Sequence, residues 1–123
     1  MIKTPKPKNS AAWRDSYYHK LFGLKAANEA GRVLRYFEAE RPRDQRPRAA
    51  IAAIRAWAEG KQKLGMKAVR KLSLDAHAAA RDVESDAAKF AAHAAGHALV
   101  AWHAPAHALG AFGYAGRAVV AAR

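Results

Sequence analysis

Four histidines lie within fifteen positions near the carboxyl end of the chain, at His93, His97, His103 and His107. Imidazole nitrogens are ligands for zinc, copper and haem iron, so this spacing raises the hypothesis of a metal- or haem-binding bundle. At 100° per residue all four share an arc of about 120° on one helix. On a straight helix, however, the first and last would be about 21 Å apart along the axis, so only i, i+4 pairs could chelate one ion. Convergence of the two pairs would require the chain to fold back at Pro105.

The alternative interpretation of the same histidines is structural. No Asp, Glu, Lys or Arg occurs between Phe90 and Gly116, and alanines surround the histidines. A neutral imidazole in a narrow gap between alanine-rich helical segments can donate a hydrogen bond to a carbonyl on the facing helix. Because burial disfavours the charged imidazolium, the folded pKa should lie below the unfolded value of about 6.5. We expect the four histidines to hold two close-packed segments together, with no metal and no cofactor.

A further polar pair, His77 and Arg81, has i, i+4 spacing beside the apolar stripe of a predicted helix. It is either a half-buried contact between helices or a polar cluster in which Arg81 binds a carboxylate of a partner. Ser73 and Ser85 lie in no nucleophile motif, and neither paired acidic residues nor a Gly-rich phosphate loop occurs. There is also no cysteine. The sequence therefore does not predict an enzyme.

Helices must position these side chains. Alanine, the strongest helix former, supplies 33 of the 123 residues, and no alternating strand pattern is present. Helical stripes run through 24–40, about 46–59, and 66–83; Ser85 or Asp86 caps a run to about His103, and a last helix occupies about 106–122. A short helix is expected from 11 to 22, with Asn9 or Ser10 as its cap and Gly23 as its end.

These patterns predict an all-α fold, a single-domain antiparallel bundle of five or six helices. Residues 10–123 form the helical domain, and residues 1–9 are expected to be a flexible basic arm. Asp44 is expected to cap the first turn of the helix that follows the loop at Pro42 and Pro47. The bulky members of the three clearest stripes should lie in the core: Phe37, Ile51, Ile54, Trp57, Val69 and Leu72.

The formal net charge is +12, and the basic residues are spread along the chain. This charge suits nucleic acid, an anionic surface or an acidic protein partner. No helix-turn-helix pattern is present, so any binding to nucleic acid is expected to be non-specific. The start of the chain lacks the apolar stretch of a secretory signal, and residues 90–116 contain too many histidines for a membrane span. We expect a cytoplasmic protein.

Three stretches of the chain form a further pattern: "DQRPRAAIAAIRAWAEG" at 44–60, "AHAAARD" at 76–82 and "AAGHALVAWHAPAHALGAFGYA" at 94–115. Together they resemble the immunity protein family of bacterial polymorphic toxin systems. The resemblance implies a small all-α domain without catalytic activity that binds a cognate toxin. The sequence departs from the family pattern at Asn28, His93, Trp102 and Pro105, and Arg43 makes the loop unusually basic.

By motif position, the resemblance carries over a set of candidate partner-binding residues, together with Pro47 and Trp57, and leaves open which are interface and which are scaffold. The candidate partner-binding residues are Asp44, Arg46, Arg48, Arg55, His77, Arg81, His97, His103 and His107. So basic an inhibitor implies a toxin with an acidic surface, and it cannot fill a basic nuclease cleft by charge mimicry. We expect a monomer or homodimer. The alternative function is a basic helical module that binds nucleic acid non-specifically.

Overall fold

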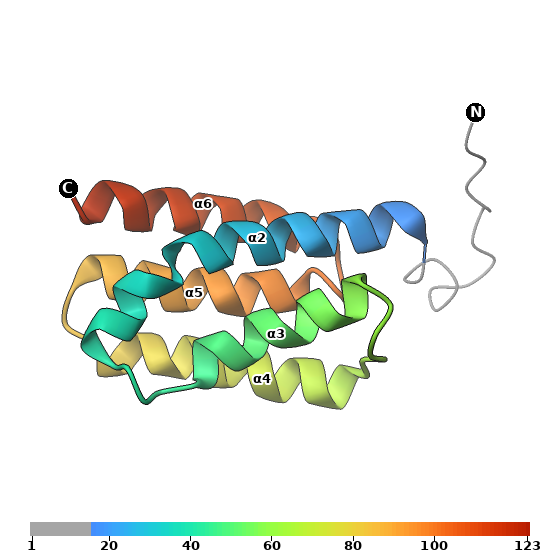
Figure 1. The fold of residues 1–123 in the computed structure, drawn as a ribbon, viewed down its shortest axis with the longest axis horizontal. Coiled ribbons are helices and arrows are strands. Elements are labelled where there is room, and N and C mark those ends of the chain that lie inside the picture. Colours follow the sequence, from blue (N-terminus) through green and yellow to red (C-terminus); the bar gives the residue numbers. More distant parts are fainter. Residues whose placement is uncertain (1–15) are drawn as a thin grey trace.

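The computed structural model describes residues 16–123, and within this range the chain is an all-α bundle without strands. Five α-helices occur there, α2 (Tyr17–Glu40), α3 (Arg46–Ala58), α4 (Met66–Ala79), α5 (Asp86–Val100) and α6 (His107–Ala121), with a 3₁₀ turn η1 (Ala80–Asp82) between α4 and α5. Successive helices run in opposite directions (Figure 1). The predicted fold class is confirmed. The predicted arm at 1–9 and the caps Asn9 and Ser10 lie outside the described residues.

Helix α5 lies in the middle of the bundle and contacts α2, α3, α4 and α6 (Figure 1). Its sequence explains this position, because a helix that is apolar all round is stable only when it is surrounded. Seven of its alanines are buried together with Gly96 and Leu99. Short side chains on α5 allow the neighbouring helix axes to approach closely.

The bulky core side chains come from the outer helices and pack against this alanine-rich centre. Phe37 and Ile54 are fully buried, and Val69 and Trp57 are 2% and 3% exposed. Ile51 is also buried, so five of the six predicted core residues are confirmed. Burial of each large side chain stabilises the fold by roughly 1.5–3 kcal/mol. Leu72 is the exception: it is only partly buried at the edge of the core, because α4 turns its adjacent face, Val69, Ser73 and Ala76, inward.

The prediction that Gly23 ends a helix is wrong. Helix α2 continues through this residue, and Ser16 caps it by accepting a hydrogen bond from the His19 backbone N–H. A Cβ atom at Gly23 would lie 3.0 Å from Trp57 Cζ3, so the glycine permits close packing of α2 on α3. The predicted helix 66–83 is also shorter than expected, since α4 ends at Ala79 and the chain tightens into η1.

Several predicted boundaries are confirmed. Ser85 caps α5 by accepting a hydrogen bond from the Ala88 N–H at 3.1 Å. Gly60, with a φ of 76°, follows α3 in the left-handed conformation that glycine adopts most readily. Pro105 lies in the turn between α5 and α6, where its missing N–H and ring prevent a continuous helix.

Candidate functional site

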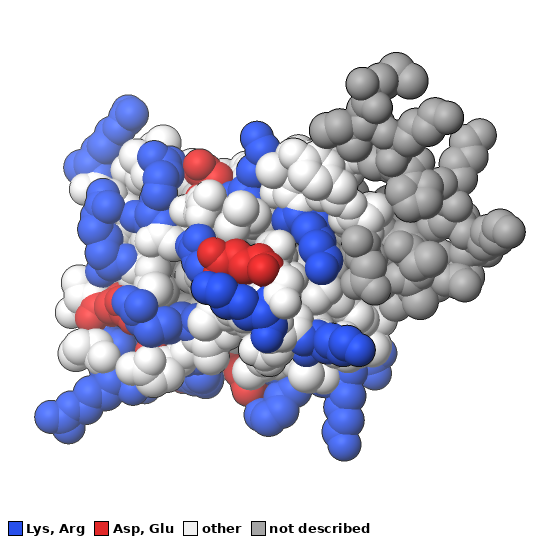
Figure 2. All heavy atoms as spheres, turned by 45° about the vertical axis from the view of Figure 1, so that its right-hand side comes forward, with Lys and Arg blue, Asp and Glu red and all other residues white. Residues whose placement is uncertain are grey.

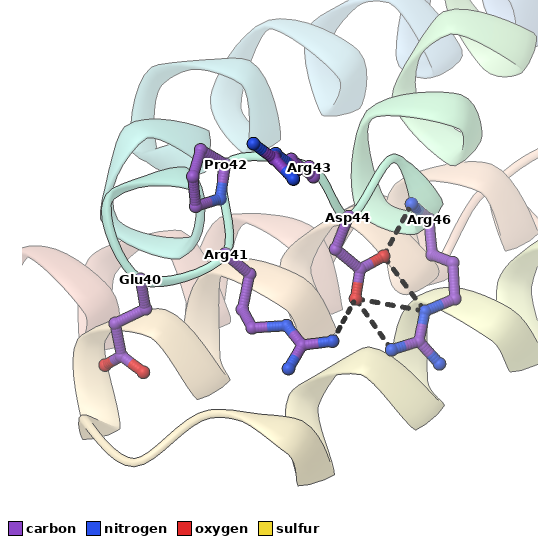
Figure 3. Close-up of a pocket in the computed structure, with 6 residues that line it drawn as sticks. All are labelled: Glu40, Arg41, Pro42, Arg43, Asp44 and Arg46. Atoms are coloured by element: carbon purple, nitrogen blue, oxygen red, sulfur yellow. Dashed lines mark hydrogen bonds and ion pairs between the residues drawn. The ribbon is translucent and has the colours of Figure 1, made fainter.

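Asp44, in the loop between α2 and α3, is the acceptor at the centre of an arginine network that we define as Arg41, Asp44, Arg46 and Asp82. Its carboxylate accepts hydrogen bonds from the Arg46 backbone N–H at 3.1 Å and from Arg46 Nε and Nη2 at 3.0 and 2.7 Å. Arg41 Nη2 approaches the same carboxylate at 3.7 Å from the other side (Figure 3). Hydrogen bonds from Arg46 hold the pKa of Asp44 below its ordinary value, despite the opposing effect of burial. Asp44 therefore binds the first N–H of α3, as predicted for the first turn, although the N-cap position itself is occupied by Gln45, which makes no side-chain cap.

Arg46 extends the network to the other half of the bundle. Its Nη2 donates to Asp82 Oδ2 at 2.6 Å, which connects the start of α3 to η1. The two carboxylates raise the pKa of Arg46, Asp44 most strongly. Nearby, Glu40 accepts hydrogen bonds from the backbone N–H groups of Glu84 and Ser85 at 3.0 and 2.9 Å. Together these contacts fix the loop 41–45 against the start of α5.

The other two motif arginines of α3 bind α2. Arg48 donates from Nε and Nη2 to the two carboxylate oxygens of Glu38 at 2.8 and 2.6 Å. Arg55 donates from Nη1 to Asn28 Oδ1 at 2.7 Å and from Nη2 to the Ala27 carbonyl at 3.4 Å. Asp44, Arg46, Arg48 and Arg55 thus all hold helices together in this protein, and the α2–α3 groove beside them has a volume of about 600 Å³.

Four imidazoles and one phenol ring meet between α4, α5 and α6. We call His77, His93, His97, His107 and Tyr114 the histidine cluster. The Nδ1 atoms of His77 and His93 are 2.7 Å apart, so one ring donates a hydrogen bond to the other. His97 packs edge-on against His77 at 5.1 Å between ring centroids and stacks on Tyr114 at the same distance. His107 lies 5.9 Å from His97. All five residues are partly buried.

Two glycines make room for these rings. A Cβ atom at Gly96 would lie 2.5 Å from His77 Nε2, and one at Gly110 would lie 2.7 Å from His97 Nδ1. Both distances are shorter than a non-bonded contact allows. The histidine of each pair therefore occupies the space that an alanine on the facing helix would fill. The expectation that histidines pack between close helical segments agrees with this geometry for His93, His97 and His107.

The environment of the cluster favours the neutral form of His77, His93 and His97. Burial, the largest cause, and the positive charges that His93, His97 and Arg81 can carry together lower the pKa of His77 to about 4. Burial also lowers the pKa of His93, with Arg81 contributing, and that of His97, with His107 and His93 contributing. For His93 and His97 these directions agree with the sequence prediction.

His103 does not join the other three histidines, so the predicted stripe of four is wrong at this position. Helix α5 ends at Val100, and His103 lies exposed in the turn that follows. The stripe assumed one straight helix, whereas the turn changes the direction of the chain before His103. In its place, His77 enters the cluster from α4. Arg81, its predicted neighbour, is exposed on η1.

The geometry gives no support to the metal hypothesis. In residues 16–123 no three His, Asp or Glu side chains are arranged to hold one ion. The Nδ1 atoms of His77 and His93 face each other at hydrogen-bond distance rather than toward a common point.

His19 is a buried histidine that the sequence analysis did not single out. Its Nε2–H donates to the Ala101 carbonyl at 2.7 Å, and its ring packs edge-on against Trp57 at a centroid distance of 5.0 Å. The signal was available, because His19 precedes Gly23, Ala26 and Ala30 at the spacing of one helical face. His19 thereby connects α2 to the turn after α5.

The fold and these contacts define a small helical domain whose polar residues join helices and whose surface is basic. No helix within residues 16–123 is both long and apolar enough to cross a membrane. The chain belongs to the family described as "Imm-5 like putative immunity protein", which matches residues 18–123. This membership suggests a role without catalysis. No curated protein and no solved structure is significantly similar to the chain.

Proposed function

We propose that this protein binds a cognate bacterial toxin and neutralises it by direct protein contact, without catalysis. The observation that carries the proposal is the family match, which covers nearly all of α2 and every later helix. The net charge of +12 favours a toxin with an acidic surface, because complementary charge accelerates encounter and disfavours wrong partners.

The nine predicted partner-binding residues have two different roles in this proposal. Seven of them hold helices together and so position the surface: Asp44, Arg46, Arg48, Arg55, His77, His97 and His107. Arg81 and His103, together with Arg48 from the first group, are exposed and remain candidates for direct contact with the toxin. We further propose that the protein acts in the cytoplasm of the producing cell as a monomer or homodimer.

The test is coexpression with the product of the neighbouring open reading frame, taken as the candidate toxin. Inducing the toxin alone should arrest growth, and inducing it together with this protein should restore growth. The two purified proteins should also elute as one complex in size-exclusion chromatography. A version of the gene with an early stop codon is the control. Growth arrest despite abundant folded protein, with no complex formed, would contradict the proposal.

Non-specific binding to nucleic acid is the alternative, and the net charge is the observation that favours it. Basic side chains are distributed over the face in Figure 2, with acidic ones between them in only a few places. Such binding should weaken steeply between about 50 and 200 mM salt and show no preference for base sequence. A thousandfold sequence preference at physiological salt, together with no toxin binding, would favour this alternative.

A further inference from the structure

Two regions of the surface differ in how their charges are compensated. In residues 38–48 and 81–89, six basic side chains accompany six carboxylates, and the arginine network and the Arg48–Glu38 pair lie there. In residues 59–75, five basic side chains accompany only Glu59 and Asp75. We call residues 59–75, together with Lys20, the lysine region. Its positive charge is largely uncompensated by the residues that the structure describes.

The two carboxylates of the lysine region are already paired. Glu59 lies 3.5 Å from Lys61 Nζ, and Asp75 accepts from Lys71 Nζ at 2.9 Å. In the described part of the chain no carboxylate lies within ion-pair distance of the remaining cations, which are Lys20, Lys63, Lys67 and Arg70. The lower edge of Figure 2, at the height of α4 in Figure 1, shows several basic side chains and little acidic surface.

A groove of about 910 Å³ lies within this region. Lys20, Lys61 and Lys63 line it, and its apolar lining includes Trp57 and Trp102. Lys20 Nζ lies 5.8 Å from the centre of the Trp57 ring. Lysines thus surround an aromatic lining that the bundle itself holds in place.

Apolar side chains are also exposed beside the groove. Met66, at its edge, is 38% exposed, and Leu74, two turns further along α4, is 60% exposed. Arg70 lies between them on the same face, since the three are four residues apart. Apolar and aromatic groups within a charged rim are typical of protein–protein interfaces. A surface that binds only phosphates has no use for exposed Met66 and Leu74.

We propose that the lysine region is the surface that contacts the toxin, and that its occupant is an acidic segment of the toxin carrying at least one apolar side chain. The carboxylates of that segment pair with Lys20, Lys61 and Lys63. One apolar side chain packs into the groove beside Met66, and a second contacts Leu74, which lies about 12 Å further along α4. This inference rests on the proposed function and adds to it the place of contact.

The test measures the affinity of the adjacently encoded toxin by titration calorimetry. Lys61→Glu/Lys63→Glu reverses two exposed charges in the loop before α4, so the fold should be retained. The matched control is Lys25→Glu/Arg43→Glu, which changes net charge equally at two exposed positions outside the lysine region. We expect the first variant to lose at least about tenfold in affinity and the control to stay within about threefold of the native protein.

Two further measurements separate charge from apolar contact. Leu74→Asn should weaken binding about tenfold without changing net charge. Acetylation of lysines by a small reagent, followed by mass spectrometry, should show that the toxin protects Lys61, Lys63 and Lys67 but not Lys25 or Lys89. This protection experiment uses the unmodified sequence and so does not depend on how a variant folds.

The outcomes distinguish this inference from the proposed function. Equal affinities for the lysine variant and its control, with tight binding by the native protein, overturn the inference and leave the proposed function intact. Absence of any binding by the native protein overturns both. Binding of a short duplex DNA at about 150 mM salt as tightly as the toxin, abolished by Lys61→Glu/Lys63→Glu, identifies a nucleic-acid surface and overturns the inference.

Discussion

In the histidine cluster, aromatic rings pack between α4, α5 and α6, and His77 and His97 lie so close to the facing helix that only glycine fits there. In the arginine network, by contrast, ion pairs join the end of α2, the start of α3 and η1 near the surface. The cluster depends on packing, because Gly96 and Gly110 leave the space that His77 and His97 occupy. The network depends on charge, because Asp44 receives both guanidinium and backbone donors.

This difference shows that polar motif residues can stabilise one fold by opposite means. Charging a neutral ring in a partly buried site lowers the stability of the fold. Neutralising a carboxylate that is bound by arginine also lowers the stability of the fold. The two regions should therefore respond differently to added volume, to pH and to salt.

The largest expected effect is on packing. Gly96→Ala should destabilise the protein by about 3 kcal/mol, at the upper end of the usual cost of overpacking, because its Cβ would lie 2.5 Å from the His77 ring. The ring cannot move aside without losing its hydrogen bond to His93. Chemical denaturation followed by circular dichroism measures the change.

The matched control for this prediction is Gly113→Ala on α6, where nothing lies within 4 Å of the added Cβ. Alanine there should stabilise the helix by roughly 0.5–1 kcal/mol, since glycine is costly in a helix interior. If both variants changed the free energy of unfolding equally, close packing of the cluster would be refuted.

The next largest effect is expected at the centre of the arginine network. Asp44→Ala should cost about 1.5 kcal/mol, because the Arg46 guanidinium and the first N–H of α3 lose a charged acceptor. The side chain of Asp44 is only 8% exposed, so water cannot readily take its place as the hydrogen-bond acceptor. Thermal unfolding at neutral pH measures this loss.

The control for this variant is Asp86→Ala, which removes an exposed carboxylate from the first turn of α5. It should cost less, within the roughly 0.3–1 kcal/mol of a charge interacting with a helix dipole. A smaller effect at Asp44 than at Asp86 would show that the network contributes little to stability.

Much of the fold could be predicted from the sequence because the residues that begin and end its helices act locally. Ser85 before α5, Gly60 after α3 and Pro105 before α6 act on their own neighbours, so their effects can be predicted without the tertiary structure. Gly23 misled this reasoning, because its role is close contact with Trp57, a residue 34 positions away. A glycine that ends a helix and one that packs against another helix look alike in a sequence.

The candidate site was less predictable, since its contacts join distant segments. Spacing placed His93 and His97 on one face of α5, but the contact of His77 with His93 depends on how α4 packs on α5. The same holds for the contacts of Arg46 with Asp82 and of Arg55 with Asn28. Motif positions singled out Arg46, Arg55, His77 and His97 but gave no information on which residues these side chains contact.

A smaller effect is expected from acidification, and it should separate the two regions. The folded pKa of His77 lies near 4, below the ordinary value of 6.5, so below pH 6.5 the unfolded chain binds more protons and stability falls until about pH 4. Asp44 has a lowered pKa as well, so its contribution is lost only as the pH falls below its ordinary value of 3.8. The melting temperature should therefore decline in two stages.

The variant that tests this assignment is His77→Gln, which cannot be protonated at this position. Its melting temperature should fall less steeply than that of the native protein between pH 6.5 and 4.5, whatever its stability at neutral pH. The other cluster residues, His93, His97, His107 and Tyr114, and Arg81 beside them stay unchanged in this comparison. Parallel melting curves for both proteins would assign the decline to groups other than His77.

The smallest effect is expected at the Arg48–Glu38 ion pair, which lies near the arginine network and is more exposed to solvent. Its side chains are 57% and 23% exposed, so the ion pair is screened by water and salt despite its two short hydrogen bonds. Glu38→Gln should cost no more than about 1 kcal/mol in low salt, and the cost should shrink in about 1 M sodium chloride, where the Debye length is about 3 Å.

Gly96→Ala should show the same destabilisation at both salt concentrations, because steric overlap is not screened. Denaturation by urea, which leaves ionic strength unchanged, measures both variants. A salt-dependent cost for Gly96→Ala, or a salt-independent one for Glu38→Gln, would show that packing and charge do not divide between the two regions as their geometry indicates.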